Sequence, residues 1–143
     1  LLLFGGGITL AKAFGVSGLS SSLAEHLSAL STMPILVMIF AICLSVTFLT
    51  ETTSNTASTV LLMPVLAATA VGSDIDPKLL MIPATISASC AFMMHVATAP
   101  NRIVYASGFF TTRTMAREGF VLNIFGTFTI TALCYLILSL TWS

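Results

Sequence analysis

The feature that most constrains this chain is a run of seven polar residues inside an apolar stretch. Residues 50–56 read Thr-Glu-Thr-Thr-Ser-Asn-Thr, and they interrupt a segment that is otherwise apolar from 34 to 71. As one helix, residues 34–71 would extend ~57 Å, whereas the hydrocarbon core of a bilayer is ~30 Å thick. Two shorter helices that meet at a polar tip inside the membrane satisfy these lengths. The sequence therefore predicts a re-entrant hairpin over residues 34–71.

The depth of this polar tip gives it a functional meaning. Irregular backbone inside a membrane is tolerated only where it is buried in protein or lines a water-filled cavity, because lipid offers no hydrogen bonds. Seven polar residues in a row leave many groups to satisfy in that way. We therefore interpret the tip as part of a binding site.

Composition supports a membrane protein independently. Hydrophobic residues make up 57% of the chain and charged residues 7%, whereas soluble domains average about 25% charged residues. The net charge is zero, so nothing indicates a nucleic-acid partner. The three cysteines, Cys43, Cys90 and Cys134, lie in apolar stretches, and their odd number and dispersal argue against a disulfide framework. We expect an all-α, multi-pass protein of the lipid bilayer, in the cell (inner) membrane.

The remaining segments divide into three parts. Residues 1–33 predict a truncated helix, a connector and an interfacial amphipathic helix, and they lack the basic start and cleavage site of a signal peptide. Residues 77–110 predict a broken transmembrane helix, and residues 119–142 a last, uninterrupted one. We expect the chain to be the C-terminal piece of a larger protein.

The break in the second element has a clear cause. A helix is expected from Pro77 to about His95, and it then meets the sequence Val-Ala-Thr-Ala-Pro-Asn at 96–101. Pro100 lacks a backbone N–H and disfavours helical geometry at Ala99. Like the tip, this break is expected at mid-membrane depth.

Basic residues indicate the orientation of the chain. Arg113 and Arg117 lie in the link 111–118, whereas the turn at 72–78 carries two acidic residues and one lysine. The positive-inside rule places the link in the cytoplasm and the turn outside. The C-terminus is then expected to be external.

Two interrupted helical elements can bind a cation and an anion side by side. A helix that ends in mid-membrane presents carbonyl groups and a partial negative charge, and a helix that begins there presents free N–H groups and a partial positive charge. Ser, Thr and Asn add neutral oxygens, which suit a monovalent cation that must be released, whereas dedicated Mg²⁺ or Ca²⁺ sites usually contain carboxylates. The pattern predicts a site that binds a small cation and an anion together.

These two interruptions also carry a family resemblance. Residues 51–58, ETTSNTAS, together with residues 89–104, SCAFMMHVATAPNRIV, resemble the divalent anion–sodium symporter family, the INDY-like di- and tricarboxylate transporters. The opening residues 2–7, LLFGGG, are also similar, so the resemblance covers the whole chain. It implies the second inverted repeat of an elevator-type transporter, a homodimer whose N-terminal repeat supplies a second hairpin and broken helix.

The resemblance implies roles for individual residues. A sodium ion would be held by Thr50, Ser54, Asn55 and the carbonyl of Ala97. The substrate carboxylate would face Ser54, Asn55, Thr56 and Thr98. The implied activity is sodium-coupled transport of a small divalent anion, most simply a C4-dicarboxylate such as succinate. A sodium-independent dicarboxylate exchanger and a sulfate or citrate carrier remain alternatives.

Several residues near the two interruptions carry more than one interpretation. Where Met94-His95, Ala99 and Arg102 stand, the family usually has a Leu/Met-Pro pair, a second proline and a small apolar residue. Glu51 is either functional or holds the backbone of the hairpin. Arg102 is either a guanidinium clamp for substrate or snorkels to the cytoplasmic side, and His95 is either a packed helix-end residue or a proton carrier. Pro100 and Asn101 are further candidates at the break.

Two other classes of protein make different predictions. Gly15-Val16-Ser17-Gly18 matches the Gly-x-Ser-Gly pattern of intramembrane serine proteases, but Ser17 lies in a polar connector instead of an apolar helix. A non-transporting membrane scaffold would show no dependence of its stability on ions or anions. The sequence favours a transporter over an enzyme.

Overall fold

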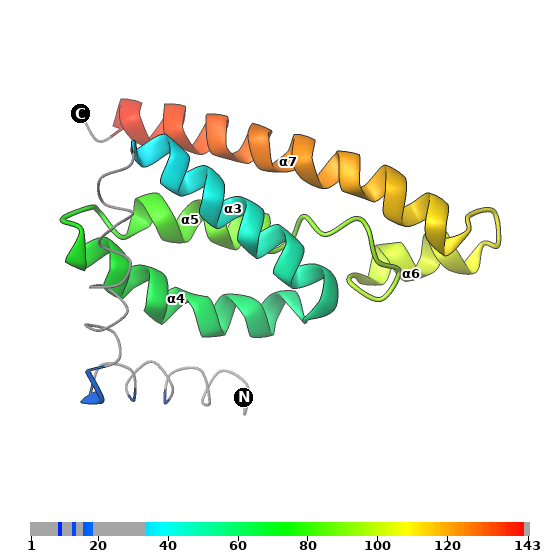
Figure 1. The fold of residues 1–143 in the computed structure, drawn as a ribbon, viewed down its shortest axis with the longest axis horizontal. Coiled ribbons are helices and arrows are strands. Elements are labelled where there is room, and N and C mark those ends of the chain that lie inside the picture. The colour runs from blue at the N-terminus through cyan, green and yellow to red at the C-terminus, as the bar shows by residue number, and fades with distance from the viewer. Residues whose placement is uncertain (1–8, 10–12, 14–15, 19–33, 142–143) are drawn as a thin grey trace.

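The regular secondary structure of the described residues is all helical. The computed structural model describes residues 9, 13, 16–18 and 34–141, and no strand occurs among them. The predicted elements of residues 1–33 therefore lie almost wholly outside the described residues. The described helices are α3 (Ile35–Thr52), α4 (Asn55–Gly72), α5 (Lys78–Ser87), α6 (Ala99–Ala106) and α7 (Thr112–Thr141) (Figure 1).

Three of these helices are suited to a membrane. By length and composition, α3, α4 and residues Thr112–Ile137 of α7 can each cross a bilayer. The two 18-residue helices α3 and α4 are each ~27 Å long, close to the ~30 Å hydrocarbon core. The predicted all-α membrane fold class is confirmed at this level.

Helices α3 and α4 are separated by two residues of the polar run, Thr53 and Ser54. Both have extended backbone, with φ −121° and ψ 166° at Thr53 and φ −70° and ψ 133° at Ser54. The Thr53 N–H still bonds to the Leu49 carbonyl at 3.2 Å, and the hydroxyls of Thr53 and Ser58 are hydrogen-bonded at 2.5 Å. From this turn the two helices diverge (Figure 1).

The core lies where α3 packs against α5 and α7. A buried apolar cluster joins these helices to the end of α4, and it consists of Met38, Ile39, Cys43, Ala70, Leu80, Ile130 and Cys134. The three cysteines of the chain are free, and two of them belong to this cluster, as the apolar surroundings in the sequence predict. The opposite sides of α3 and α7 expose large apolar residues, as expected of helices that face lipid or further protein.

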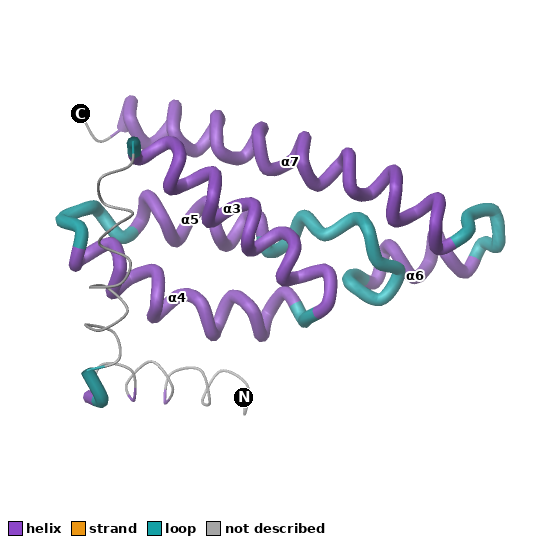
Figure 2. The backbone as a smooth tube through the Cα atoms, viewed as in Figure 1, coloured by secondary structure: helices purple, strands orange, loops and turns teal. Residues whose placement is uncertain are grey.

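Two helix boundaries differ from those predicted. Helix α5 ends at Ser87, well before His95, and the chain then runs as turns and irregular loop to Thr98 (Figure 2). Helix α7 begins at Thr112 instead of residue 119. The Thr111 hydroxyl accepts a bond from the Thr114 N–H at 3.2 Å, so it caps a first turn built from polar residues.

Candidate functional site

The two polar interruptions of the sequence line one cavity. Its volume is about 550 Å³, and its wall comes from two separate parts of the chain. The first part is the end of α3 and the start of α4, residues 51–56. The second is residues 96–100, with Arg102 from α6. The structure thus brings together the α3–α4 turn and the break before α6.

The α3–α4 turn leaves its polar groups available to a ligand. Ser54 is the N-cap of α4, yet its side chain makes no capping hydrogen bond. The first N–H groups of α4 therefore have no side-chain cap, and they carry the positive end of the helix dipole. The Asn55 Oδ1 atom is buried and has no hydrogen-bond partner among the described residues. A buried carbonyl oxygen without a partner is costly, and a bound cation would satisfy it.

The break before α6 presents a second helix start to the same cavity. Thr98 is the N-cap of α6, and its hydroxyl oxygen accepts a bond from the Asn101 N–H at 3.3 Å. Pro100 lies within the first turn, where its missing N–H costs nothing. Ala97 precedes the cap and also lines the cavity.

The cavity wall contains two charged side chains, Arg102 and Glu51, and they differ in how many hydrogen bonds they already make. Arg102 is the only residue with a positive charge among those that line the cavity, and one of its N–H groups donates to the Val96 carbonyl at 3.1 Å. The guanidinium therefore folds back over the break, and its other donors remain for an anion. Glu51 also lines the cavity, but its carboxylate already accepts three hydrogen bonds.

The Glu51 carboxylate binds the loop before α6 and the last helix. Its two oxygens accept the N–H groups of Met93, at 2.9 Å, and Met94, at 2.8 Å. The Asn123 side chain of α7 donates to the same carboxylate at 2.6 Å. Among the described residues, no donor to this carboxylate belongs to the hairpin. Glu51 therefore connects the end of α3 to the loop before α6 and to α7, and does not bond the hairpin backbone. Asn123 was not among the predicted site residues, although an Asn within an apolar span is a signal for a buried polar partner.

Three of the candidate residues do not line this cavity. The Thr50 side chain is buried, and its hydroxyl lies 3.1 Å and 2.9 Å from the carbonyls of Val46 and Thr47 in its own helix. Asn101 is also buried, and its amide nitrogen donates to carbonyls of the loop before α6. His95 lies in a turn, and its ring stacks on Tyr105 with centroids 4.5 Å apart.

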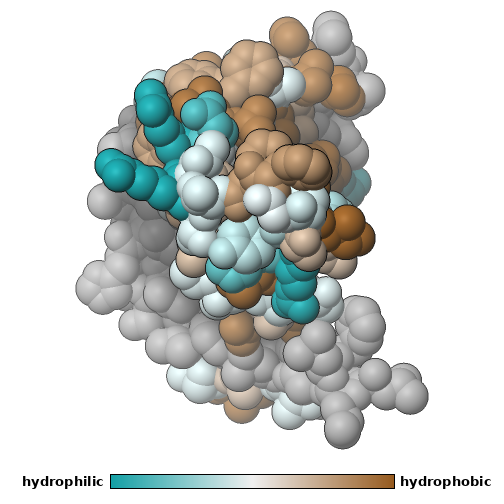
Figure 3. All heavy atoms as spheres, turned by 90° about the vertical axis from the view of Figure 1, so that its right-hand side faces the viewer, coloured by the Kyte–Doolittle hydropathy of each residue, from teal (hydrophilic) through white to brown (hydrophobic). Residues whose placement is uncertain are grey.

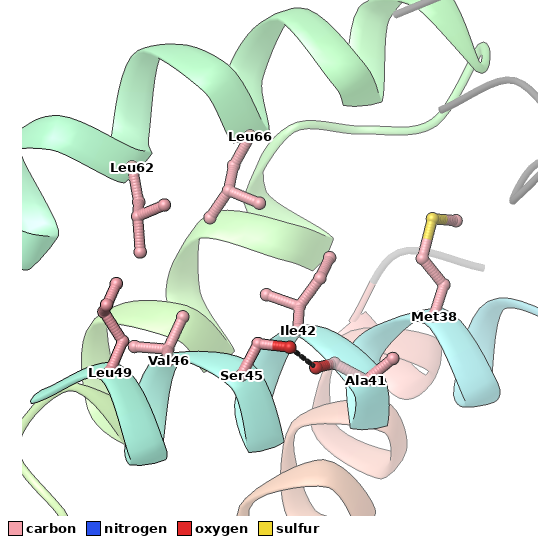
Figure 4. A pocket seen from close by; sticks show the side chains of 8 residues that line it. All are labelled: Met38, Ala41, Ile42, Ser45, Val46, Leu49, Leu62 and Leu66. Atoms are coloured by element: carbon pink, nitrogen blue, oxygen red, sulfur yellow. Dashed lines mark hydrogen bonds between the residues drawn. The ribbon is translucent and has the colours of Figure 1, made fainter. Parts of the chain in front are cut away.

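A second cavity is different in chemistry. It holds about 380 Å³ between α3 and α4, and Leu62 and Leu66 point across it toward α3 (Figure 4). Ser45 is the one hydroxyl in its wall, and it donates to the Ala41 carbonyl of its own helix at 2.8 Å. This cavity offers apolar surface and little polar chemistry, so the polar cavity is the candidate site.

The polar cavity lies toward one end of the molecule. Figure 3 views the end at which α6, the α3–α4 turn and the start of α7 lie, and hydrophilic groups gather there among apolar ones. Among the described residues, no group of three or more His, Cys, Asp or Glu side chains is arranged to hold a metal ion.

Comparisons with known proteins agree with the chemistry of this cavity. The family described as "Sodium:sulfate symporter transmembrane region" matches residues 1–142. The chain is 42% identical over 135 residues to the sodium-dependent dicarboxylate transporter SdcS of Staphylococcus saprophyticus, covering 94% of this chain and 26% of that protein. It is 45% identical over 131 residues to mouse solute carrier family 13 member 2, covering 92% of this chain and 22% of that protein.

The comparisons also show how much of a whole transporter this chain represents. It spans about a quarter of the length of these relatives. The relatives are transporters and not enzymes, so the protease alternative at Ser17 gains no support from them. The resemblance seen in the sequence is confirmed.

Proposed function

The chain belongs to the sodium:sulfate symporter family, and we propose that it supplies half of the binding site of a sodium-coupled anion transporter. The substrate is a small divalent anion, with a C4-dicarboxylate such as succinate as the best candidate. The observation that carries the proposal is the cavity that joins the uncapped start of α4 to the break before α6. Several relatives are sodium-dependent dicarboxylate transporters, and this supports the choice of ions.

The anion is recognised by positive ends of helices and by hydroxyls. The first N–H groups of α4, the side chains of Ser54, Asn55 and Thr56, and the Thr98 hydroxyl face one carboxylate of the substrate. Backbone N–H groups at a helix start bind anions without a full positive charge. Arg102 adds the one cationic side chain of the wall.

The sodium ion is held by neutral oxygens. Ser54, Asn55, Thr50 and the carbonyl of Ala97 are the proposed ligands, and the unpartnered Asn55 Oδ1 fits this role. The Thr50 hydroxyl, which is directed at carbonyls of its own helix, has to reorient to bind sodium. Uncharged ligands bind sodium weakly enough for release in each transport cycle.

The rest of the site comes from outside this chain. The N-terminal repeat of the full-length protein supplies a second hairpin and broken helix, and the protein is a homodimer that moves its binding site in an elevator-type step. The hairpin of residues 34–71 enters the membrane and returns to the same side. In the cell membrane the C-terminus is external.

Succinate binding across a sodium titration tests this function. The full-length protein is reconstituted in lipid, and choline replaces sodium at constant ionic strength. Each ligand should strengthen binding of the other reciprocally, by the roughly 5- to 150-fold typical of coupled sites. Binding that does not depend on sodium would reject symport and favour an exchanger. No anion binding in any salt would reject the transporter itself.

Two substitutions and a control assign the effect to this cavity. Asn55→Ala removes an oxygen and an N–H donor from the tip, and it should abolish coupled binding and transport. Thr50→Ala should weaken sodium affinity while succinate binding returns at high sodium. Ser45→Ala alters the apolar cavity of Figure 4 and should change neither sodium affinity nor succinate binding.

A further inference from the structure

The loop that precedes the cavity wall is held by side chains from other helices. Residues 90–94 form no helix. Three successive backbone N–H groups in it are nevertheless bonded. Phe92 N–H donates to Asn123 Oδ1 at 3.1 Å, and Met93 and Met94 donate to Glu51 at 2.9 Å and 2.8 Å. Side chains of α3 and α7 thus replace the missing helical hydrogen bonds of this loop.

Glu51 and Asn123 form a buried pair. Glu51 is 4% exposed and Asn123 is 0% exposed. The Asn123 amide nitrogen donates to Glu51 at 2.6 Å while its oxygen accepts from Phe92. Each partner therefore fixes the orientation of the other. A buried carboxylate without hydrogen-bond donors is costly, so any movement that breaks these bonds is unfavourable.

The other side of the loop is held as well. The buried Asn101 amide nitrogen donates to the carbonyls of Ala91, at 2.9 Å, and Met94, at 3.0 Å. Gly119 of α7 lies so close that an added Cβ would overlap the Phe92 carbonyl group. Backbone atoms of residues 91–94 are consequently bonded to or in contact with α3, α6 and α7.

We propose that Glu51 and Asn123 are positioning residues that set the distance between the tip at Ser54–Asn55 and the cavity wall at 96–98. Glu51 lies near the end of α3, three residues before Ser54, and its carboxylate bonds the loop two residues before that wall. A ligand that contacts both parts depends on their separation. Asn123 extends the same connection to α7, so the last helix shares in shaping the site. This inference rests on the proposed function, because its readout is sodium-coupled binding.

A reciprocal exchange of the two side-chain groups tests the pair. Glu51→Gln leaves one oxygen for three donors and turns an NH₂ group toward one of them. Asn123→Asp places two carboxylates in contact. The double variant restores a donor opposite an acceptor between positions 51 and 123. It leaves the Met93 N–H, which shares Glu51 Oε1 with the Asn123 amide, facing an NH₂ group. We expect each single variant to raise the half-saturating sodium concentration about tenfold, and the double variant to recover part of this loss.

Two further variants separate positioning from charge and from general packing. Glu51→Asp keeps the charge but is one methylene too short for both N–H groups, so it should also lose sodium affinity. Thr127→Val, one turn along α7, removes a hydroxyl that, among the described residues, bonds only to the Asn123 carbonyl of its own helix, and it should leave sodium dependence unchanged. Normal sodium affinity in Glu51→Asp would show that charge alone matters and would overturn the proposal.

The same titration separates failure of the proposed function from failure of the Glu51–Asn123 proposal. Sodium-coupled binding by the unmutated protein tests the proposed function alone. The pair is rejected if folded single variants, monodisperse on size exclusion, titrate as the unmutated protein does. It is also rejected if the double variant is no better than the poorer single one. Where a single variant does not fold, recovery of folded protein by the double variant supports the pair, and continued failure overturns it.

Discussion

Two glycines of α7 provide a matched test of the packing around the loop. They lie seven residues apart, at Gly119 and Gly126, and so face nearly the same side of the helix. A Cβ at Gly119 would overlap the Phe92 carbonyl and lie 2.6 Å from the Met93 Cα, whereas a Cβ at Gly126 has no neighbour within 4 Å among the described residues. Alanine should therefore lower the stability of the protein at position 119 and raise it at position 126.

The size of each effect follows from packing and helix propensity. Overpacking costs ~1–3 kcal/mol, and the upper end applies at Gly119 because the overlapped atoms are backbone and are held by Glu51 and Asn123. Alanine returns ~1 kcal/mol of helix propensity at either site. We expect Gly119→Ala to destabilise the protein by ~2 kcal/mol and Gly126→Ala to stabilise it by up to ~1 kcal/mol.

Thermal unfolding of the full-length protein in detergent measures this difference. A change of 1 kcal/mol moves Tm by ~2–4 °C in a domain of about 200 residues and by less in a longer protein, so Gly119→Ala should unfold at a measurably lower temperature than Gly126→Ala. Sodium-coupled succinate binding of Gly119→Ala should also weaken, because a displaced loop moves the cavity wall. Equal shifts in Tm for the two variants, or a more stable Gly119→Ala, would refute the packing argument.

Three further predictions concern topology and the cavity. Single cysteines at Ser73 and Thr112, in a cysteine-free background, should react with a membrane-impermeant thiol reagent from opposite faces of the membrane; labelling from one face would exclude the proposed arrangement. Arg102→Ala should raise the KM for the anion severalfold with sodium dependence nearly intact, and an unchanged KM would leave its bond to the Val96 carbonyl as its role. Tyr105→Leu removes the ring stacked on His95 and should lower Tm without changing the sodium response, whereas an altered sodium response would place this stack in the site.

Much of the site could be predicted because its signals are local in the sequence. The polar run at 50–56 and the Pro100 break are interruptions of apolar segments, and irregular backbone inside a membrane requires a cavity or a buried partner. The structure places Ser54, Asn55 and Thr98 on one cavity wall, although they come from interruptions more than forty residues apart. Their proximity was expected from the family resemblance, which assigns residues of both interruptions to one sodium site and one carboxylate site.

Other features required three-dimensional contacts. The early end of α5 at Ser87 was not predicted, since the residues that follow are apolar enough to continue a helix. They remain irregular because Glu51 and Asn123 satisfy their N–H groups from 42 and 31 residues away in the chain. Thr50 looked like part of the exposed tip, yet its position on α3 buries it in the helix packing.

The amino-acid sequence by itself determined the membrane class, the two interrupted elements and the polar groups at each interruption. These depend on hydropathy, helix length and the missing N–H of proline, which act within a few residues. Only the tertiary structure decided which polar groups remain free for a ligand and which serve the fold. Glu51 and Asn55 are both polar residues of the same run, but three donors occupy the first and none of the described residues reaches the Oδ1 of the second. That difference arises from hydrogen bonds between distant segments, which no local pattern encodes.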